Sequence, residues 1–413
     1  MARTLDVCLE QQLIGHLIQD DGGQMVFDYD PAWLDNPARF PISCSLPLRS
    51  ERFTQKECRG FFGGILPEEG NRKVIARILK ISEKNDFAML ERIGGECAGA
   101  LTFVPQGESP PQPDYEYRAL SDAELAEILQ TLPKRPLLAG EKGVRLSLAG
   151  AQDKVAVKLD GAGRAWLPHN YAPSTHILKP AIATWDGLVA NEAFCMTLAR
   201  AVGFNAAETT AHKIGDIEYL LSERYDRTVD EDGKIHRLHQ EDFCQALGVP
   251  SGIKYQAEGG PGLKECFALL RVTSSNAVID LRSLLDAVTF NWLIGNNDAH
   301  AKNYSIIYGR DGMRRLAPLY DLVCTVYYPE IENKLAMMIG GQANPDLVFP
   351  EEFQVFAREA GLAPALVKQR IPGLARDVIE SIKTIEAADE TSGKIAALIT
   401  ERCERVISSF RSS

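Results

Sequence analysis

Residues 291–305 read NWLIGNNDAHAKNYS, and the rest of the chain is best understood outward from this stretch. An apolar run leads into Gly295 and then into polar residues that include Asp298, His300, Lys302 and Asn303. An aspartate five residues before an asparagine is the spacing that phosphoryl transfer uses. The aspartate takes the proton of the attacking hydroxyl, and the asparagine binds Mg²⁺. The alternative is a polar loop that only caps a helix and satisfies backbone groups.

A second aspartate downstream extends this pattern. Residues 316–322 read LAPLYDL and place Asp321 after another apolar run, where we expect a short strand. Protein kinases carry H-R-D-x-x-x-x-N followed by D-F-G, whose aspartate holds Mg²⁺. Here the histidine follows the first aspartate, and Y-D-L stands in place of D-F-G. The spacing therefore indicates a catalytic base at Asp298 and Mg²⁺ ligands at Asn303 and Asp321.

Length and composition set the broad class of protein. The 413 residues exceed what one hydrophobic core usually covers, so we expect two or three domains or lobes. No apolar run reaches the roughly 20 residues that a membrane helix needs, and we expect no signal peptide. The nine cysteines form no C-x-x-C pair and are odd in number, which favours a reducing cytoplasm. The net charge of -11 argues against general attraction to nucleic acid or anionic membranes, although a local basic patch is compatible with it.

The first hundred residues have the pattern of a small mixed domain. Alternating apolar residues predict strands at 5–9, 13–17 and 25–29, and one apolar stripe predicts a helix at 71–79. Residues 105–114, PQGESPPQPD, contain four prolines and are typical of a linker. After it, Ser121 with Glu124 three residues on forms a capping-box pattern, which predicts the start of a helix that runs to about residue 130.

Three further segments carry candidate binding residues. In residues 143–159, GVRLSLAGAQDKVAVKL, two alternating segments flank a turn of small residues whose backbone N–H groups could approach phosphate oxygens. A hairpin turn without a ligand is the alternative. The strand 176–180, HILKP, contains Lys179, and the helix after it contains Glu192. Kinases pair a phosphate-binding lysine with a carboxylate in this order, whereas a solvent-exposed lysine is the alternative.

The second half of the chain is dominated by helical patterns. A strand at 217–224 runs into the charged segment 223–227, where a kinase hinge would bind adenine through its backbone. We expect a helix at 238–248, capped by its final glycine. Further apolar stripes predict helices at 263–273, 280–294, 350–361, 363–386 and 391–410.

Taken together, these segments resemble the HipA family of bacterial serine/threonine protein kinase toxins over nearly the whole chain. The stretches that carry the resemblance appear in family order: SLAGAQDK (147–154), HILKP (176–180), ERYDR (223–227), QEDFCQALG (240–248), KYQAEGGPG (254–262), residues 291–305 and PLYD (318–321). The resemblance implies an α+β, bilobal, protein-kinase-like fold. Its strand-rich N-terminal lobe would carry an extra small mixed domain, and its C-terminal lobe would be all-helical. The expected divisions are a HipA-type mixed subdomain at 1–104, a linker at 105–118, the N-lobe with the phosphate loop at 119–228 and the helical lobe with the catalytic loop at 229–413.

The resemblance also implies roles for individual residues. Asp298 would be the catalytic base, Asn303 and Asp321 would bind Mg²⁺, and Ser147 would be autophosphorylated, which displaces the phosphate loop and inactivates the kinase. The added charge of about −1.5 to −2 would repel the phosphates of ATP. The residues expected to contact ATP are Ala149, Gly150, Ala151, Gln152, Asp153, Lys154, Lys179, Glu223, Arg224, Tyr225, His300, Ala301, Lys302, Asn303, Tyr320 and Asp321.

Partners follow from the same resemblance. Family members use ATP and Mg²⁺, typically phosphorylate an aminoacyl-tRNA synthetase such as glutamyl-tRNA synthetase, and thereby favour growth arrest and drug tolerance. They bind a small helix-turn-helix antitoxin of the HipB type, and the pair represses its own operon. Residues 340–353 lack the Lys and Arg that touch DNA in the best-known member, so we expect operator DNA to be bound mainly through the antitoxin. A small-molecule or lipid kinase of the same fold and a non-enzymatic co-repressor are the alternatives.

Overall fold

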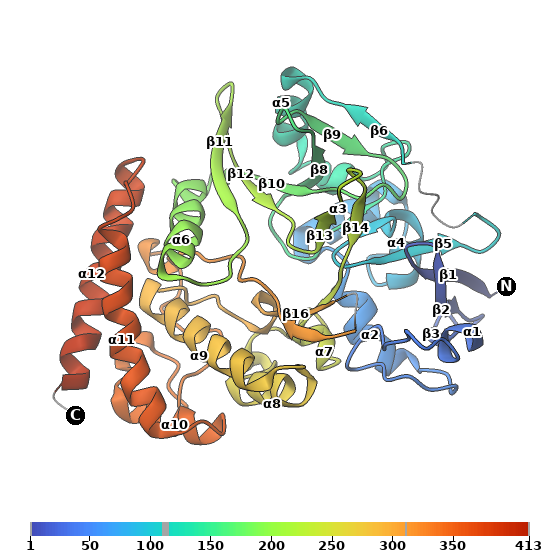
Figure 1. Cartoon of the computed structure of the whole chain (residues 1–413). Helices are drawn as coiled ribbons and strands as arrows, with labels where there is room; N and C mark the ends of the chain where they lie inside the picture. The colour runs from blue at the N-terminus through green and yellow to red at the C-terminus, as the bar shows by residue number, and fades with distance from the viewer. Residues whose placement is uncertain (1, 110–114, 310–311, 412–413) are drawn as a thin grey trace. The chain divides into compact units, whose positions relative to one another are not determined.

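The computed structural model describes residues 2–109, 115–309 and 312–411, and the chain divides into two compact units. Unit 1 comprises Met1–Pro180, His212–Gly252 and Ile307–Met313. Unit 2 comprises Ala181–Ala211, Ile253–Ile306 and Arg314–Ser413. Figure 1 follows the chain through both units by colour. The units are interleaved along the sequence, and the expected divisions after residues 104, 118 and 228 stay a prediction.

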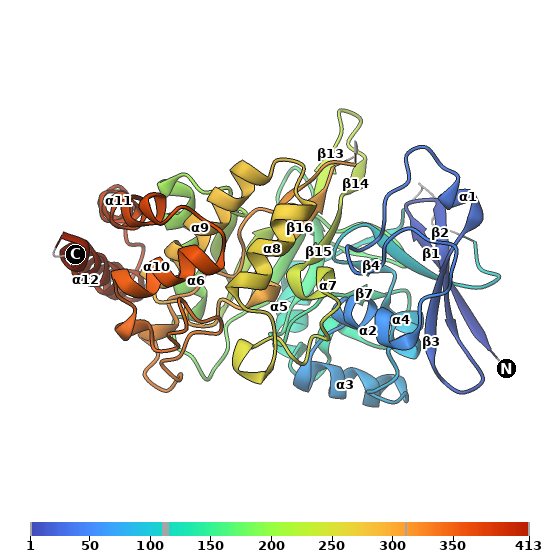
Figure 2. The same cartoon turned by 90° about the horizontal axis from the view of Figure 1, so that it is seen from below.

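The N-terminal part of unit 1 is an antiparallel sheet in the order β3-β2-β1-β5. Its strands are β1 (Arg3–Leu9), β2 (Gln12–Gln19), β3 (Met25–Tyr29) and β5 (Leu101–Pro105), which confirms the three strands predicted at its start. Four helices belong to the same region: α1 (Pro31–Leu34), α2 (Gln55–Gly64), α3 (Glu69–Leu79) and α4 (Asp86–Ile93). Of these, α2 and α4 lie along the sheet and cover it (Figure 2). Phe27, Phe62 and Phe103 pack together in the resulting core.

A second sheet has six strands, in the order β11-β12-β10-β8-β9-β6. Its strands are β6 (Tyr117–Ala119), β8 (Val155–Leu159), β9 (Ala165–Pro168), β10 (His176–Pro180), β11 (Thr209–Ile214) and β12 (Ile217–Glu223). The predicted linker falls partly on residues 110–114, which lie outside the described residues. After it, α5 (Asp122–Thr131) begins with the predicted capping box of Ser121 and Glu124. The sheet places β10, which carries Lys179, between β8 and β12.

The turn of small residues at 149–154 does not join a hairpin. The strand before it, β7 (Leu146–Ser147), pairs in parallel with β4 (Glu96–Cys97). The strand after it, β8, belongs to the six-stranded sheet. The alternative of a hairpin turn without a ligand is therefore wrong, because the two strands that flank residues 149–154 belong to different sheets.

The helix expected at 238–248 is also wrong. This segment forms β15 (His239–Asp242) and a single helical turn, α7 (Phe243–Ala246), after the hairpin of β13 (Arg227–Val229) and β14 (Ile235–Arg237). Contacts with residues distant in the sequence explain why residues 239–242 form a strand. The buried Glu241 carboxylate accepts hydrogen bonds from the Ser43 hydroxyl at 2.5 Å, the Cys44 backbone N–H at 2.9 Å and the Tyr308 hydroxyl at 2.5 Å. Burial raises the pKa of Glu241 despite these donors.

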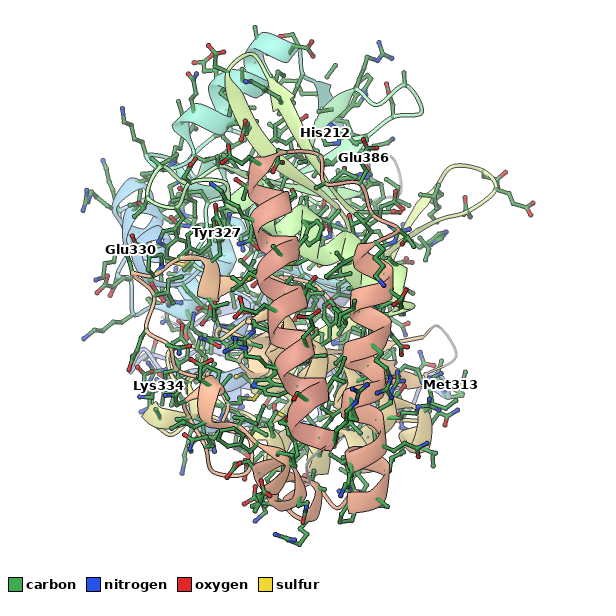
Figure 3. The ribbon with its side chains drawn as sticks, turned by 90° about the vertical axis from the view of Figure 1, so that its left-hand side faces the viewer. His212, Met313, Tyr327, Glu330, Lys334 and Glu386 are labelled. Atoms are coloured by element: carbon green, nitrogen blue, oxygen red, sulfur yellow. The ribbon has the colours of Figure 1, made fainter. Side chains whose placement is uncertain are left out.

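Unit 2 is built mainly of helices, at positions close to those predicted. They are α6 (Leu188–Val202), α8 (Leu263–Thr273), α9 (Ala277–Ile294), α10 (Pro350–Glu359), α11 (Pro364–Ile382) and α12 (Glu390–Arg411). Figure 3 looks onto α11 and α12, which lie side by side. The second half also contains the short strands β16 (Ser305–Tyr308) and β17 (Arg314–Leu316), so it is mainly helical rather than all-helical. Among the described helices, none is long and apolar enough to cross a membrane.

Candidate active site

The catalytic-loop candidate begins where α9 ends at Gly295. This glycine has a left-handed φ of 73°, and a Cβ here would lie 2.3 Å from the Val326 side chain. Thr325 then fixes the turn: its hydroxyl donates to the Gly295 carbonyl at 2.9 Å and accepts from the Asn297 N–H at 2.8 Å. Glycine is needed at this position because the Val326 side chain approaches so closely.

Asp298 emerges from this turn with its side chain exposed, whereas His300, Lys302 and Asn303 are buried. Its Oδ1 accepts a hydrogen bond from the Tyr255 hydroxyl at 3.0 Å. The backbone is held as well, because the His300 N–H donates to the Asp298 carbonyl at 2.7 Å. An exposed carboxylate on a fixed backbone can accept a proton from a hydroxyl of another molecule.

Asn303 and Asp321, the predicted metal ligands, lie in contact: the Asn303 Nδ2 donates to the Asp321 Oδ2 at 3.2 Å. Asp321 does not sit on the expected strand. It follows Leu319, which bridges to Ala206, and has a left-handed φ of 60°. Such backbone is costly for a non-glycine residue and clusters at functional sites. The Asn296 Nδ2 supports it by donating to the Asp321 carbonyl at 3.4 Å.

This donor set fits Mg²⁺. Magnesium is usually held by one or two protein oxygens together with substrate phosphates and waters. A flip of the Asn303 amide, whose orientation follows from its hydrogen bonds, would present an oxygen beside the Asp321 carboxylate. The described residues contain no larger group of three or more His, Cys, Asp or Glu side chains suited to a metal.

The backbone of the catalytic loop is also tied to the segment that contains Asp321. The Tyr320 hydroxyl donates to the Lys302 carbonyl at 2.6 Å and lies 2.7 Å from the Ser305 hydroxyl. His300 precedes, and Lys302 lies within, a helical turn at Ala301–Asn303. Asp298 and Asn303 therefore lie on one loop of unit 2, and Asn303 contacts Asp321, while ATP contact by His300, Ala301, Lys302 and Tyr320 stays a prediction.

The phosphate-loop candidate, residues 149–154, lies in unit 1. Gly150 has a left-handed φ of 101°. Three successive carbonyls point to partners within the unit: Ala149 accepts from Lys154 Nζ at 2.7 Å, Gly150 from the Glu68 N–H at 3.3 Å and Ala151 from Asn71 Nδ2 at 2.8 Å. Turning carbonyls toward the protein is what a loop needs if its N–H groups are to face an anion.

Asp153 and Gln152 belong to the same loop. Burial raises the pKa of Asp153, opposed by a hydrogen bond from Asn71 and by the charge of Lys154. Contact of this loop with ATP stays a prediction.

Ser147, the expected autophosphorylation site, is completely buried, with 0% of its surface exposed. Its hydroxyl donates to the Ile65 carbonyl at 3.0 Å, and its backbone lies opposite Cys97 in the β4–β7 pair. It does not alternate outward to solvent on its strand. In this conformation the hydroxyl is inaccessible, so phosphorylation requires β7 to leave its place.

Lys179 lies opposite Leu220 in the β10–β12 ladder of unit 1 and is half-buried. Glu192 lies on α6 in unit 2 and is buried. The proposed pairing of the two stays a prediction. Glu223, at the end of β12, is exposed.

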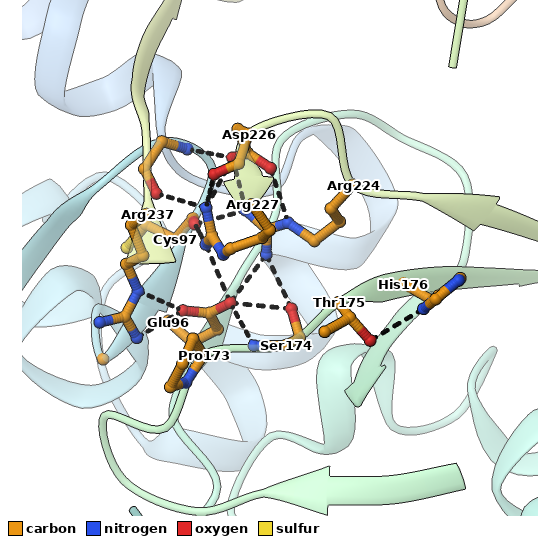
Figure 4. Close-up of polar contacts among 12 residues, drawn as sticks. Glu96, Cys97, Pro173, Ser174, Thr175, His176, Arg224, Asp226, Arg227 and Arg237 are labelled. Carbon is orange, nitrogen blue, oxygen red and sulfur yellow. Dashed lines mark hydrogen bonds and ion pairs between the residues drawn. The ribbon is translucent and has the colours of Figure 1, made fainter. Parts of the chain in front are cut away.

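Arg224 has a different position from the one expected of an ATP contact. Its guanidinium is 2% exposed and pairs with Glu96 at 2.9 Å and with Asp226 at 2.8 Å (Figure 4). Its backbone N–H donates to the Thr175 carbonyl at 2.9 Å. The guanidinium and the backbone N–H of Arg224 both bind partners inside unit 1. We therefore keep only Glu223 and Tyr225 as the expected hinge contacts with ATP. The Tyr225 hydroxyl donates to the Gln240 side chain.

Glu96 is the centre of this buried cluster. Arg227 and Arg237 also reach its carboxylate, at 2.9 and 2.7 Å. Burial alone would raise the pKa of Glu96, but Arg227, Arg237 and Arg224 outweigh it and hold that pKa well below its usual range. Arg224 and Arg227 also donate to the Cys97 carbonyl, at 2.8 and 2.9 Å. The cluster therefore fixes β4, the strand that pairs with β7 and hence with Ser147.

Sequence reasoning missed two features of this site. The ERYDR motif has the pattern of a hinge, but its arginines bind the carboxylate of Glu96, far away in the chain. The sequence places Tyr255 in the KYQAEGGPG motif and gives no sign of its contact with Asp298. The tyrosine beside a glycine-rich loop was the only indication of a role.

Known proteins are similar to this chain over almost its entire length. Residues 5–104 match the model of the HipA N-terminal domain, and residues 146–385 match that of the HipA-like C-terminal domain. Y4mE of Sinorhizobium fredii, whose name includes the word kinase, is 47% identical over 93% of this chain and 92% of its own. The serine/threonine-protein kinase toxin HipA of Shewanella oneidensis is 30% identical over 98% of this chain and 96% of its own.

A solved structure extends the comparison to three dimensions. A chain of the Shewanella oneidensis complex of HipA, HipB and operator DNA superposes with a TM-score of 0.86 and 28% identity. The match covers 99% of this chain and 98% of that one. The expected α+β, kinase-like fold is thereby confirmed.

Proposed function

Because this chain belongs to the HipA family and is a serine/threonine-protein kinase, we propose that it is the toxin of a bacterial toxin–antitoxin pair. It transfers the γ-phosphoryl group of ATP to a serine or threonine of a target protein. One observation carries the proposed site: the exposed Asp298 lies on the same loop as Asn303, and Asn303 contacts Asp321. This is the constellation that phosphoryl transfer needs.

The chemistry assigns one task to each residue. Asp298 accepts the proton of the substrate hydroxyl while the hydroxyl oxygen bonds to the γ-phosphorus. The bond from that phosphorus to the bridging oxygen breaks, and ADP leaves with the electron pair. Asn303 and Asp321 are the residues that would hold Mg²⁺, which neutralises phosphate charge when bound.

We assign contact with ATP to the following residues: Ala149, Gly150, Ala151, Gln152, Asp153, Lys154, Lys179, Glu223, Tyr225, His300, Ala301, Lys302, Asn303, Tyr320 and Asp321. The inward carbonyls of the 149–154 loop support its part in this assignment.

Removing either metal ligand should weaken Mg²⁺-dependent nucleotide binding. Asp321→Ala or Asn303→Ala each deletes an oxygen that Mg²⁺ requires, and we expect affinity for ATP with Mg²⁺ to fall about tenfold or more, since one lost charge-assisted contact is worth that much. Calorimetric titration of Mg²⁺ at fixed ATP measures it. Asn36→Ala is the control, because it removes an amide whose oxygen accepts a hydrogen bond from the Ala38 N–H. Titrations of the two variants that overlay wild type would place the metal site elsewhere.

Autophosphorylation at Ser147 is the proposed off switch. At 4–5 Å and an effective dielectric near 20, each pair of like unit charges repels by roughly 3–4 kcal/mol, which is enough to displace ATP. Because Ser147 is buried against Ile65, the modified form must also release β7 from β4.

Ser147→Ala should bind nucleotide and escape self-inactivation. Intact mass after treatment with ATP, followed by mapping of the modified residue, decides the assignment, and Ser121→Ala on the exposed N-cap of α5 is the control. Phosphate found only at other residues would refute the switch. Wild-type ATP affinity in the Ser147-phosphorylated protein would refute it as well.

Partners and targets complete the proposal. The relative's complex with HipB and operator DNA supports a helix-turn-helix antitoxin of the HipB type as the partner of this chain. DNA contact is assigned mainly to that antitoxin, because residues 340–353, up to the first turns of α10, contain no Lys or Arg. The proposed target is an aminoacyl-tRNA synthetase, such as glutamyl-tRNA synthetase, in the cytoplasm. Labelling of a bacterial extract with radioactive ATP and identification of the labelled protein test the target directly.

A further inference from the structure

We infer that Tyr255 is a positioning residue for phosphoryl transfer. Its hydroxyl binds one oxygen of the Asp298 carboxylate and thereby holds the carboxylate in position for the incoming substrate hydroxyl. The inference rests on the proposed function, in which Asp298 is the base. No role for Tyr255 follows from the spacing of catalytic residues in the sequence.

The direct contact is a hydrogen bond of ordinary length, 3.0 Å from the Tyr255 hydroxyl to Asp298 Oδ1. Asp298 is exposed, and an exposed aspartate can rotate about its side-chain bonds unless a neighbour holds it. A base must stay within hydrogen-bond reach of the incoming hydroxyl. A donor on one carboxylate oxygen restricts that rotation.

The ring of Tyr255 is itself held in place. It packs edge-on against the His300 ring, with centroids 5.5 Å apart, and the Lys254 ammonium lies 5.4 Å from its centroid. His300 is buried and lies two residues beyond the base. Tyr255 therefore contacts the catalytic loop at two points, one polar and one aromatic.

The backbone next to Tyr255 and the backbone next to Asp298 both bond to the same residue, Ala336. Residue 256, next to the tyrosine, donates its N–H to the Ala336 carbonyl at 3.1 Å. Ala336 in turn donates its N–H to the carbonyl of Asn297, next to the base, at 2.8 Å. The Gln256 side chain accepts from the Met338 N–H at 2.7 Å. This short ladder fixes the distance between the Tyr255 loop and the Asp298 loop.

The close packing of the KYQAEGGPG loop explains why it contains glycines. A Cβ at Gly260 would lie 2.5 Å from the Ile253 carbonyl oxygen, and one at Gly262 would lie 2.7 Å from the Gln256 amide. The turn closes through the Gly260 N–H, which donates to the Tyr255 carbonyl at 2.9 Å. Only residues without a side chain allow this tight return. The KYQAEGGPG segment is thus a compact turn that presents one tyrosine to the base.

The test is Tyr255→Phe. This variant keeps the ring on His300 and the whole backbone ladder, and loses only the hydroxyl. We expect the maximal rate of phosphate incorporation from labelled ATP into protein to fall about 10- to 100-fold, the rate equivalent of a lost hydrogen bond to a charged group. The KM for ATP should stay within about twofold of wild type. Tyr117→Phe, which removes a hydroxyl bonded to the Pro173 carbonyl at 2.9 Å in unit 1, is the matched control and should leave both constants unchanged.

The pH profile gives a readout that a purely structural role would not move. A donor to the ionised carboxylate favours that form, so loss of the hydroxyl should shift the acidic limb of the rate profile to higher pH. An unchanged or faster rate in Tyr255→Phe would overturn the inference, the latter by showing that the tyrosine blocks the base. A raised KM with an unchanged maximal rate, or lost ATP binding, would overturn it too.

Asp298→Asn, assayed in parallel, separates this inference from the proposed function. If Asp298→Asn retains transfer, or wild type transfers none, the assignment of the base fails and the role of Tyr255 fails with it. If Asp298→Asn is inactive while Tyr255→Phe equals wild type, only the role of Tyr255 is refuted.

Discussion

Asp298→Asn will abolish phosphoryl transfer while leaving nucleotide binding intact. General-base catalysis contributes about 10²–10⁴-fold to a rate, so the variant should keep no more than a few per cent of wild-type activity. The substitution nearly preserves shape, and the asparagine oxygen can still accept the hydrogen bond that Tyr255 donates to Oδ1. The proposed metal ligands, Asn303 and Asp321, are untouched.

Autophosphorylation and nucleotide binding are measured on the same preparation of Asp298→Asn. Asp377→Asn, an exposed change on α11 that also removes one negative charge, controls for the loss of charge. Transfer above a few per cent of wild type, with normal binding, would remove Asp298 from the role of base.

Glu96→Ala will strongly destabilise unit 1. The carboxylate is 1% exposed and receives Arg224, Arg227 and Arg237, which are each 2% exposed. Breaking a buried pair by removing one partner typically costs about 3–5 kcal/mol, because uncompensated charge stays behind in the interior. Denaturant unfolding measures the free energy. Glu91→Ala, which removes the 25% exposed carboxylate that pairs with Arg3, should cost less than about 1 kcal/mol.

The pKa of Glu96 also predicts how the stability of the fold changes in acid. Its pKa is depressed in the folded state, so its contribution to stability is fully present above the ordinary value of 4.5 and is lost as the pH falls below it. The stability difference between wild type and Glu96→Gln should therefore shrink in acid. A difference that stays constant or grows as the pH falls would show that the charge of Glu96 does not stabilise the fold.

What the sequence predicted well was local. Helices with one apolar stripe and a terminal glycine were placed within a few residues, and α8 was placed at its observed bounds, Leu263–Thr273. The spacing of Asp298 and Asn303 sufficed to find the loop because both residues follow one helix end. Asp321 could be added because it follows a short apolar run.

What the sequence could not predict depended on distant partners. The 239–242 segment has a helical pattern, but it is a strand in which Glu241 meets Ser43, Cys44 and Tyr308. The two residues of β7 carry too little pattern to reveal their pairing with β4. The role of Arg224 depends on Glu96, and that of Tyr255 on a contact between two loops. No local periodicity encodes such pairs.

The most direct test of the central claim is transfer of label from γ-labelled ATP, with Mg²⁺, to proteins of a bacterial extract by the purified chain. Phosphoamino-acid analysis of the labelled protein follows. The account predicts label on serine or threonine of protein, dependent on the added chain and absent with Asp298→Asn. Label confined to small molecules or lipids, or no transfer by wild-type chain that binds ATP, would contradict it.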